Sequence, residues 1–78
     1  MITDGSTTVS YVEQIGQTAG LVWQALNDGG PQSLTKLIQA AGAPRDAVLQ
    51  AIGWLAREDK LWVEETKRGR LFRLRPPG

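Results

Sequence analysis

The last residues of the chain hold a concentration of positive charge with the chemistry to contact phosphate groups. The 78 residues include nine basic and eight acidic ones, for a formal net charge of +1. Residues 1–66 carry four of the basic and all eight acidic residues, a net charge of −4, whereas residues 67–78 carry five basic residues and no acidic one, a net charge of +5. Clustered cations neutralise nucleic-acid phosphates and displace their counterions. The asymmetry is a first indication of an anionic partner.

Catalytic and metal-binding groups are poorly represented by comparison. The chain has no Cys and no His, which excludes thiol nucleophiles, imidazole bases and the usual zinc ligands. Glu64 and Glu65 are adjacent and would point to opposite faces of a strand, so they do not form a catalytic pair. The Gly29-Gly30-Pro31 cluster breaks a helix and lacks the spacing of a phosphate-binding loop. We therefore expect no enzyme, no cofactor, no metal and no small-molecule substrate.

Three helices should precede the basic segment. Apolar residues recur at helical spacing from Tyr11 until the breaker cluster at residues 27–31. Ser33 occupies an N-cap position for a short second helix, and Gly42 a position typical of a helix end. A third helix is expected over residues 45–58, with a buried stripe that consists of Val48, Leu49, Ile52, Leu55 and Ala56. Trp23 lies on the apolar stripe of the first helix and is expected in the core.

After the third helix the apolar period changes to two, which indicates a β-hairpin. A two-residue turn at Arg68-Gly69 would use the glycine for a positive φ. This register pairs Val63 with Leu74 toward the core and leaves two cross-strand pairs on the other face, Glu64–Arg73 and the cation–π pair Trp62–Arg75. Residues near 31–33 could add a brief third strand to the hairpin. Three of the five C-terminal cations, those nearest the turn, then remain unpaired.

This order of elements looks like a winged helix-turn-helix domain. The strings at residues 15–20 (IGQTAG), 33–37 (SLTKL) and above all 53–60 (GWLAREDK) resemble a small bacterial and archaeal family of single-domain winged-helix proteins of unknown function. The resemblance implies a mainly α fold with a small β-hairpin (α+β), three helices and a C-terminal wing. It implies function only by analogy, because winged helices bind DNA, RNA or proteins.

The sequence also suggests how the chain is organised. We expect a flexible N-terminal arm over residues 1–10, the winged-helix domain over residues 11–75 and a tail over residues 76–78. No apolar run approaches the roughly 20 residues that span a bilayer, and the N-terminus lacks the features of a secretory signal. We therefore expect no membrane partner and a cytoplasmic location, with which the absence of Cys agrees.

The first functional hypothesis is a DNA-binding protein of the transcription-regulator type. The wing would lie on the phosphate backbone, the second helix would contact phosphates through its N-terminal end, and the third helix would point toward the major groove. The candidate contacts are Ser33, Thr35, Lys36, Arg45, Gln50, Lys67, Arg68 and Arg70. The third helix has few side chains that can read bases, since Asp46 would repel phosphate and its alanines offer no polar group.

The alternative hypothesis is a protein–protein interaction or homodimerisation module. Trp54 lies away from the predicted buried stripe, where it would either pack sideways against the hairpin beside Trp62 or belong to an exposed patch. Trp and Arg are enriched at interface hot spots. The candidate interface residues are Ala47, Ala51, Trp54 and Arg57.

Overall fold

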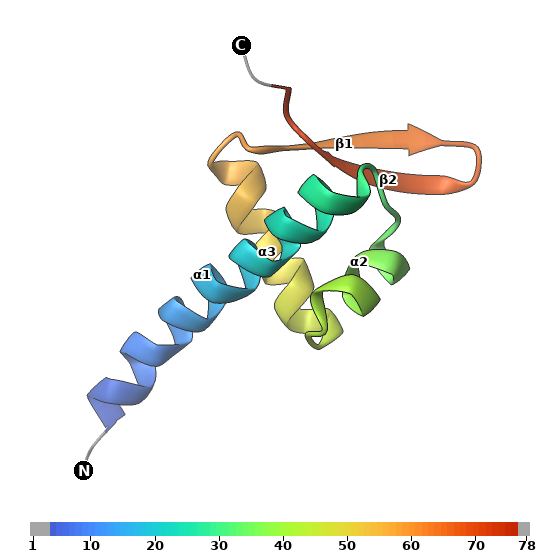
Figure 1. Cartoon of the computed structure of the whole chain (residues 1–78). Coiled ribbons are helices and arrows are strands. Elements are labelled where there is room, and N and C mark those ends of the chain that lie inside the picture. Colours follow the sequence, from blue (N-terminus) through green and yellow to red (C-terminus); the bar gives the residue numbers. More distant parts are fainter. Residues whose placement is uncertain (1–3, 77–78) are drawn as a thin grey trace.

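The computed structural model describes residues 4–76 of the chain. Three helices precede a β-hairpin (Figure 1): α1 (Asp4–Gly29), α2 (Leu34–Ala41), α3 (Arg45–Arg57), β1 (Leu61–Thr66) and β2 (Gly69–Leu74). In Figure 1, α2 and α3 lie beside the C-terminal half of α1, and the hairpin lies across that same end. The predicted fold class, mainly helical with a small antiparallel hairpin, is confirmed.

The first helix begins earlier than the sequence predicts. We expected the helical period to begin at Tyr11, and the backbone is already helical from Asp4. Once the turns from Tyr11 onward exist, each preceding residue extends the helix at little cost, since nucleation is the expensive step. Residues 1–3 and 77–78 lie outside the described part of the chain. The division into arm, domain and tail stays a prediction.

The ends of the second helix follow the predicted capping chemistry. The Ser33 hydroxyl accepts a hydrogen bond from the backbone N–H of Lys36 at 3.3 Å. Gly42 has a φ of 67°, and its N–H donates to the carbonyl of Ile38 at 3.1 Å. Glycine adopts this left-handed conformation without the steric cost that a Cβ would impose. The turn between α2 and α3 is thereby fixed by two short-range signals in the sequence.

The core lies between the three helices and the inner face of the hairpin. Its largest fully buried side chains come one from each helix: Val22, Leu37 and Val48. The hairpin contributes Leu61 and Phe72, which are 5% and 6% exposed. Apolar residues from all five elements therefore share one cluster, as a domain of this size requires.

The buried stripe of α3 differs from the predicted one at its edges. Ala51 is fully buried, whereas Leu49 is 41% exposed and Ala56 is exposed. Ala51 belongs to the same core cluster as Ala19 and Val22 of α1. A small side chain lets two helices approach closely, and the longer Leu49 is left on the solvent side. The helix is therefore rotated relative to the predicted stripe.

The hairpin turn lies one residue earlier than predicted. Lys67 and Arg68 form the loop, and Thr66 is the cross-strand partner of Gly69. The positive φ of 128° falls at Gly69, the first residue of β2, and neither loop residue has a positive φ. The two faces of the hairpin keep the predicted sorting, but every cross-strand pair changes, so that Val63 now lies opposite Phe72.

A short third edge of the sheet forms as predicted. Gln32 and Phe72 exchange two backbone hydrogen bonds, from Gln32 N–H at 3.0 Å and from Phe72 N–H at 2.8 Å. The Gln32 side chain also donates to the carbonyl of Ala25 at 2.8 Å. These bonds join the start of α2 to β2 and to the end of α1.

Candidate nucleic-acid interface

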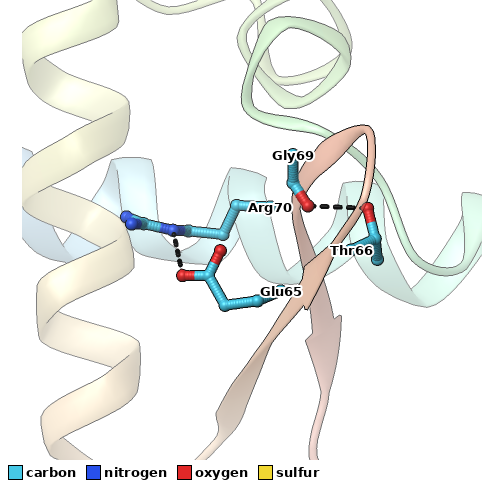
Figure 2. Close-up of polar contacts among 4 residues, drawn as sticks. All are labelled: Glu65, Thr66, Gly69 and Arg70. Atoms are coloured by element: carbon cyan, nitrogen blue, oxygen red, sulfur yellow. Dashed lines mark hydrogen bonds and ion pairs between the residues drawn. The ribbon is translucent and has the colours of Figure 1, made fainter.

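The hairpin tip, which consists of the loop residues Lys67 and Arg68, carries two positive charges. Hydrogen bonds of Thr66 hold the backbone of this loop in place. The Thr66 hydroxyl donates to the carbonyl of Gly69 at 2.7 Å, as Figure 2 shows, and accepts from the N–H of Arg68 at 3.2 Å. The side chains of Lys67 and Arg68 are exposed and form no ion pair with any of the side chains described, residues 11–76. Their charges are therefore available to a ligand.

Arg70, the third cation expected near the tip, is already engaged. Its Nε lies 3.2 Å from a carboxylate oxygen of Glu65, its cross-strand partner. Figure 2 shows both side chains extending from the hairpin on the side of α3. The two side chains are 61% and 72% exposed, and exposed pairs of this kind are worth only about 0–1 kcal/mol. A phosphate can compete with Glu65 for Arg70.

The body of the hairpin is closer to neutral. Arg73 pairs with Glu64 at 3.2 Å, as the predicted charge sorting required. The predicted cation–π pair between Trp62 and Arg75 is wrong, because the shifted register places Arg73 opposite Trp62. Arg75 instead pairs with Asp59 at 2.6 Å. Within the hairpin, the cations that have no acidic partner among the side chains of residues 11–76 are therefore those of the tip, Lys67 and Arg68.

The entrance of α2 lies beside the hairpin. The two backbone bonds between Gln32 and Phe72 place residues 33–36 next to the outer edge of β2. Thr35 and Lys36 are exposed, and Lys36 forms no ion pair with another side chain of residues 11–76. The Ser33 hydroxyl is occupied by its own cap bond. Of the three residues predicted here, two therefore present free side chains and Ser33 acts first as a cap.

The third helix presents a mixed outer face. Arg45, its first residue, is exposed, but the neighbouring Asp46 is acidic. Gln50 is exposed as predicted, and its Nε2 donates to the Tyr11 hydroxyl of α1 at 2.6 Å. The role of Tyr11 was not predicted, because no local signal links two residues that are 39 positions apart.

The predicted protein–protein interface cannot include all four of its candidate residues. Ala51 is fully buried, so it cannot belong to an exposed patch with Ala47, Trp54 and Arg57. Trp54 is 38% exposed and lines a shallow hollow with Gly16, Gly20 and Trp23 of α1. Trp62 does not line that hollow. Trp23, which was expected in the core, is also 38% exposed. The prediction of an apolar patch that includes Ala51 is wrong.

The described residues contain no group of three acidic, His or Cys side chains that could hold a metal ion. None of their helices is long and apolar enough to cross a membrane.

Most of the chain matches a known protein family. The family model described as winged helix-turn-helix domain (DUF2582) matches residues 11–74. The chain belongs to this family. The winged-helix family predicted from the sequence is thereby confirmed. The uncharacterized protein MJ1608 of Methanocaldococcus jannaschii is 45% identical over 53 residues, which cover 64% of this chain and 74% of that protein.

Solved structures show the same winged helix-turn-helix fold. The solution structure of BT2368 from Bacteroides thetaiotaomicron has a TM-score of 0.73 and 31% identity, covering 80% of this chain and 76% of that one. The Zalpha domain of Carassius auratus PKZ, solved in complex with Z-DNA, has a TM-score of 0.68 and 13% identity over 78% and 97% of the two chains. Bordetella bronchiseptica BpsR, whose DNA binding is regulated by 6-hydroxynicotinic acid, has a TM-score of 0.71 and 21% identity. The match covers 92% of this chain and 66% of that one.

Proposed function

We propose that this winged helix-turn-helix protein binds double-stranded DNA in the manner of a transcription regulator, mainly through the phosphate backbone. The observation that carries the proposal is the hairpin tip, where Lys67 and Arg68 are exposed without an acidic partner among the side chains of residues 11–76. The family is shown by the match over residues 11–74, and two proteins of similar fold are described by their DNA binding.

The proposed contacts fall into two groups. Phosphates would be held by the tip, by Arg70 once it leaves Glu65, and by the α2 entrance, where Thr35 and Lys36 are exposed. Exposed backbone N–H groups at a helix N-terminus add a partial positive charge for the same purpose. Backbone hydrogen bonds between Gln32 and Phe72 join this entrance to β2. The hairpin and the N-terminal end of α2 are therefore held in a fixed position relative to each other. Such contacts set affinity and orientation without reading sequence.

Base contacts would come from α3. Arg45 and Gln50 are its proposed readers, since guanidinium and amide groups match the hydrogen-bonding edges of bases in the major groove. Asp46 lies beside Arg45 in the first turn and opposes close approach of phosphate. The account therefore predicts that electrostatic contacts supply most of the affinity and that base readout is confined to few positions.

A titration of a fluorescent DNA duplex with the protein, followed by anisotropy, tests the proposal. We expect binding at about 50 mM salt that weakens steeply toward about 200 mM, because each phosphate contact releases counterions. The logarithm of the association constant should fall linearly with the logarithm of salt concentration. A protein that leaves the anisotropy unchanged at the lower salt concentration does not bind DNA in the proposed way.

A further inference from the structure

A long-range contact fixes the glutamine on the outer face of α3. Gln50 Nε2 donates to the Tyr11 hydroxyl at 2.6 Å, which joins α3 to the N-terminal half of α1. Among the side chains described, residues 11–76, this is the one hydrogen bond between those two helices. Both residues are exposed, so the contact does not exclude a ligand by burial.

The contact uses only part of the hydrogen-bonding capacity of Gln50. A primary amide has two N–H donors and a carbonyl oxygen with two lone pairs. Tyr11 takes one N–H, and the second N–H and Oε1 have no other side-chain partner among residues 11–76. This donor–acceptor pair is complementary to N7 and the N6 amino group of adenine in the major groove.

The contact also restricts the side chain before DNA arrives. An exposed glutamine normally rotates freely and loses that freedom on binding. Its bond to Tyr11 holds the amide in one orientation, and a pre-organised group loses less entropy when it binds. The residues beside it on α3 offer little competing readout, since Ala47 and Gly53 have no polar side chain and Asp46 is an acceptor only.

We infer that Tyr11 is a positioning residue for Gln50, and that the oriented amide gives this protein a preference for adenine at one position of the bound duplex. The inference rests on the proposed DNA binding and adds a specificity-determining pair to it. A contact that merely blocked Gln50 would have the opposite consequence, because removing the Tyr11 hydroxyl would then improve base discrimination.

The test begins with selection of bound duplexes from a randomised pool by the full chain, followed by anisotropy on the selected duplex and on one with that adenine replaced by guanine. We expect a preference of about tenfold for adenine. Tyr11→Phe, which keeps the ring and removes the hydroxyl, should reduce this ratio severalfold while affinity for the substituted duplex stays unchanged. Gln50→Glu should shift the preference to cytosine, whose N4 amino group donates a hydrogen bond to a carboxylate.

Gln17→Ala provides the matched control, because it alters an exposed glutamine of α1 whose side chain forms no hydrogen bond with another described residue. It should leave the adenine preference intact. Binding without a preferred adenine would overturn the inference and leave the proposed function standing, whereas absence of binding at low salt would remove both. Sharper discrimination by Tyr11→Phe would also overturn the inference. A thermal unfolding curve for Tyr11→Phe that matches the parent protein ties its effect to positioning of Gln50.

Discussion

The Arg73 guanidinium lies 3.2 Å from the Glu64 carboxylate although neither residue is the cross-strand partner of the other. Leu71 stands opposite Glu64 and Trp62 opposite Arg73, so the ion pair runs diagonally across the hairpin. Diagonal neighbours in an antiparallel pair remain within reach of long side chains. The positive charge of the strand body is thereby neutralised, and the tip is left as the place where the hairpin can bind an anion.

Two glycine substitutions should change stability in opposite directions. Gly69→Ala places a Cβ on a backbone with a φ of 128° and should destabilise the protein by about 1–3 kcal/mol. Gly53→Ala lies within α3, where a Cβ meets nothing within 4 Å, and should stabilise it by about 0.5–1 kcal/mol. Urea unfolding followed by circular dichroism measures both. Equal effects of the two changes would contradict the observed position of the turn.

The rotation of α3 can be tested with two neighbouring residues. Val48→Ala opens a cavity at a fully buried site and should cost about 2 kcal/mol or more. Leu49→Ala removes a larger side chain that is 41% exposed, and we expect a loss below about 1 kcal/mol. The free energies of unfolding from denaturant titrations decide the order. A larger loss for Leu49→Ala would instead support the stripe predicted from the sequence.

Ser33 allows the stability of α2 to be separated from DNA binding. Ser33→Ala removes the acceptor of the Lys36 N–H and should lower stability by about 1 kcal/mol. Ser33→Asp restores an acceptor and suits the helix dipole, so stability should return. The same carboxylate would repel phosphate, and DNA affinity should fall. Thermal unfolding and anisotropy on the same two variants measure these effects, and undiminished binding by Ser33→Asp would exclude phosphate contact at this helix end.

Glu65 is predicted to restrain DNA binding. Glu65→Gln removes the carboxylate that lies 3.2 Å from Arg70 Nε and makes the tip more positive. We expect affinity to rise about two- to fivefold at low salt. Glu13→Gln, on an exposed residue of α1, makes the same charge change away from the tip and serves as the control. An equal gain from both variants would show that only net charge matters.

Local signals in the sequence predict the elements of this fold well. The Ser33 cap, the left-handed Gly42 and the bridge at Gln32 are all found as expected. The two ends of α2 depend on one residue type at one backbone conformation and on hydrogen bonds within a few residues, whereas the bridge joins Gln32 to the distant Phe72. The GWLAREDK string at residues 53–60, with two shorter strings, also led to the correct family.

Features set by contacts between elements were harder to predict. The apolar stripe of α3 allowed either Leu49 or Ala51 at its edge, and packing against α1 decided in favour of the smaller residue. Gly69 correctly indicated a turn close by. Its positive φ occurs at the first residue of β2, directly after the loop, and not within the loop as predicted. The contact between Tyr11 and Gln50 depends on how α1 lies beside α3, and no spacing rule reveals it.

We expect the hairpin tip to hold DNA phosphates through Lys67 and Arg68. The deciding measurement compares the salt dependence of duplex binding by the Lys67→Ala/Arg68→Ala variant with that of Lys60→Ala/Arg75→Ala. The second pair makes the same charge change at residues that already have acidic partners. The account predicts that the tip variant loses at least about tenfold in affinity at low salt and about two units of the logarithmic salt slope, while the control retains most of both. Equal losses by the two variants, or no loss by the tip variant, would contradict it.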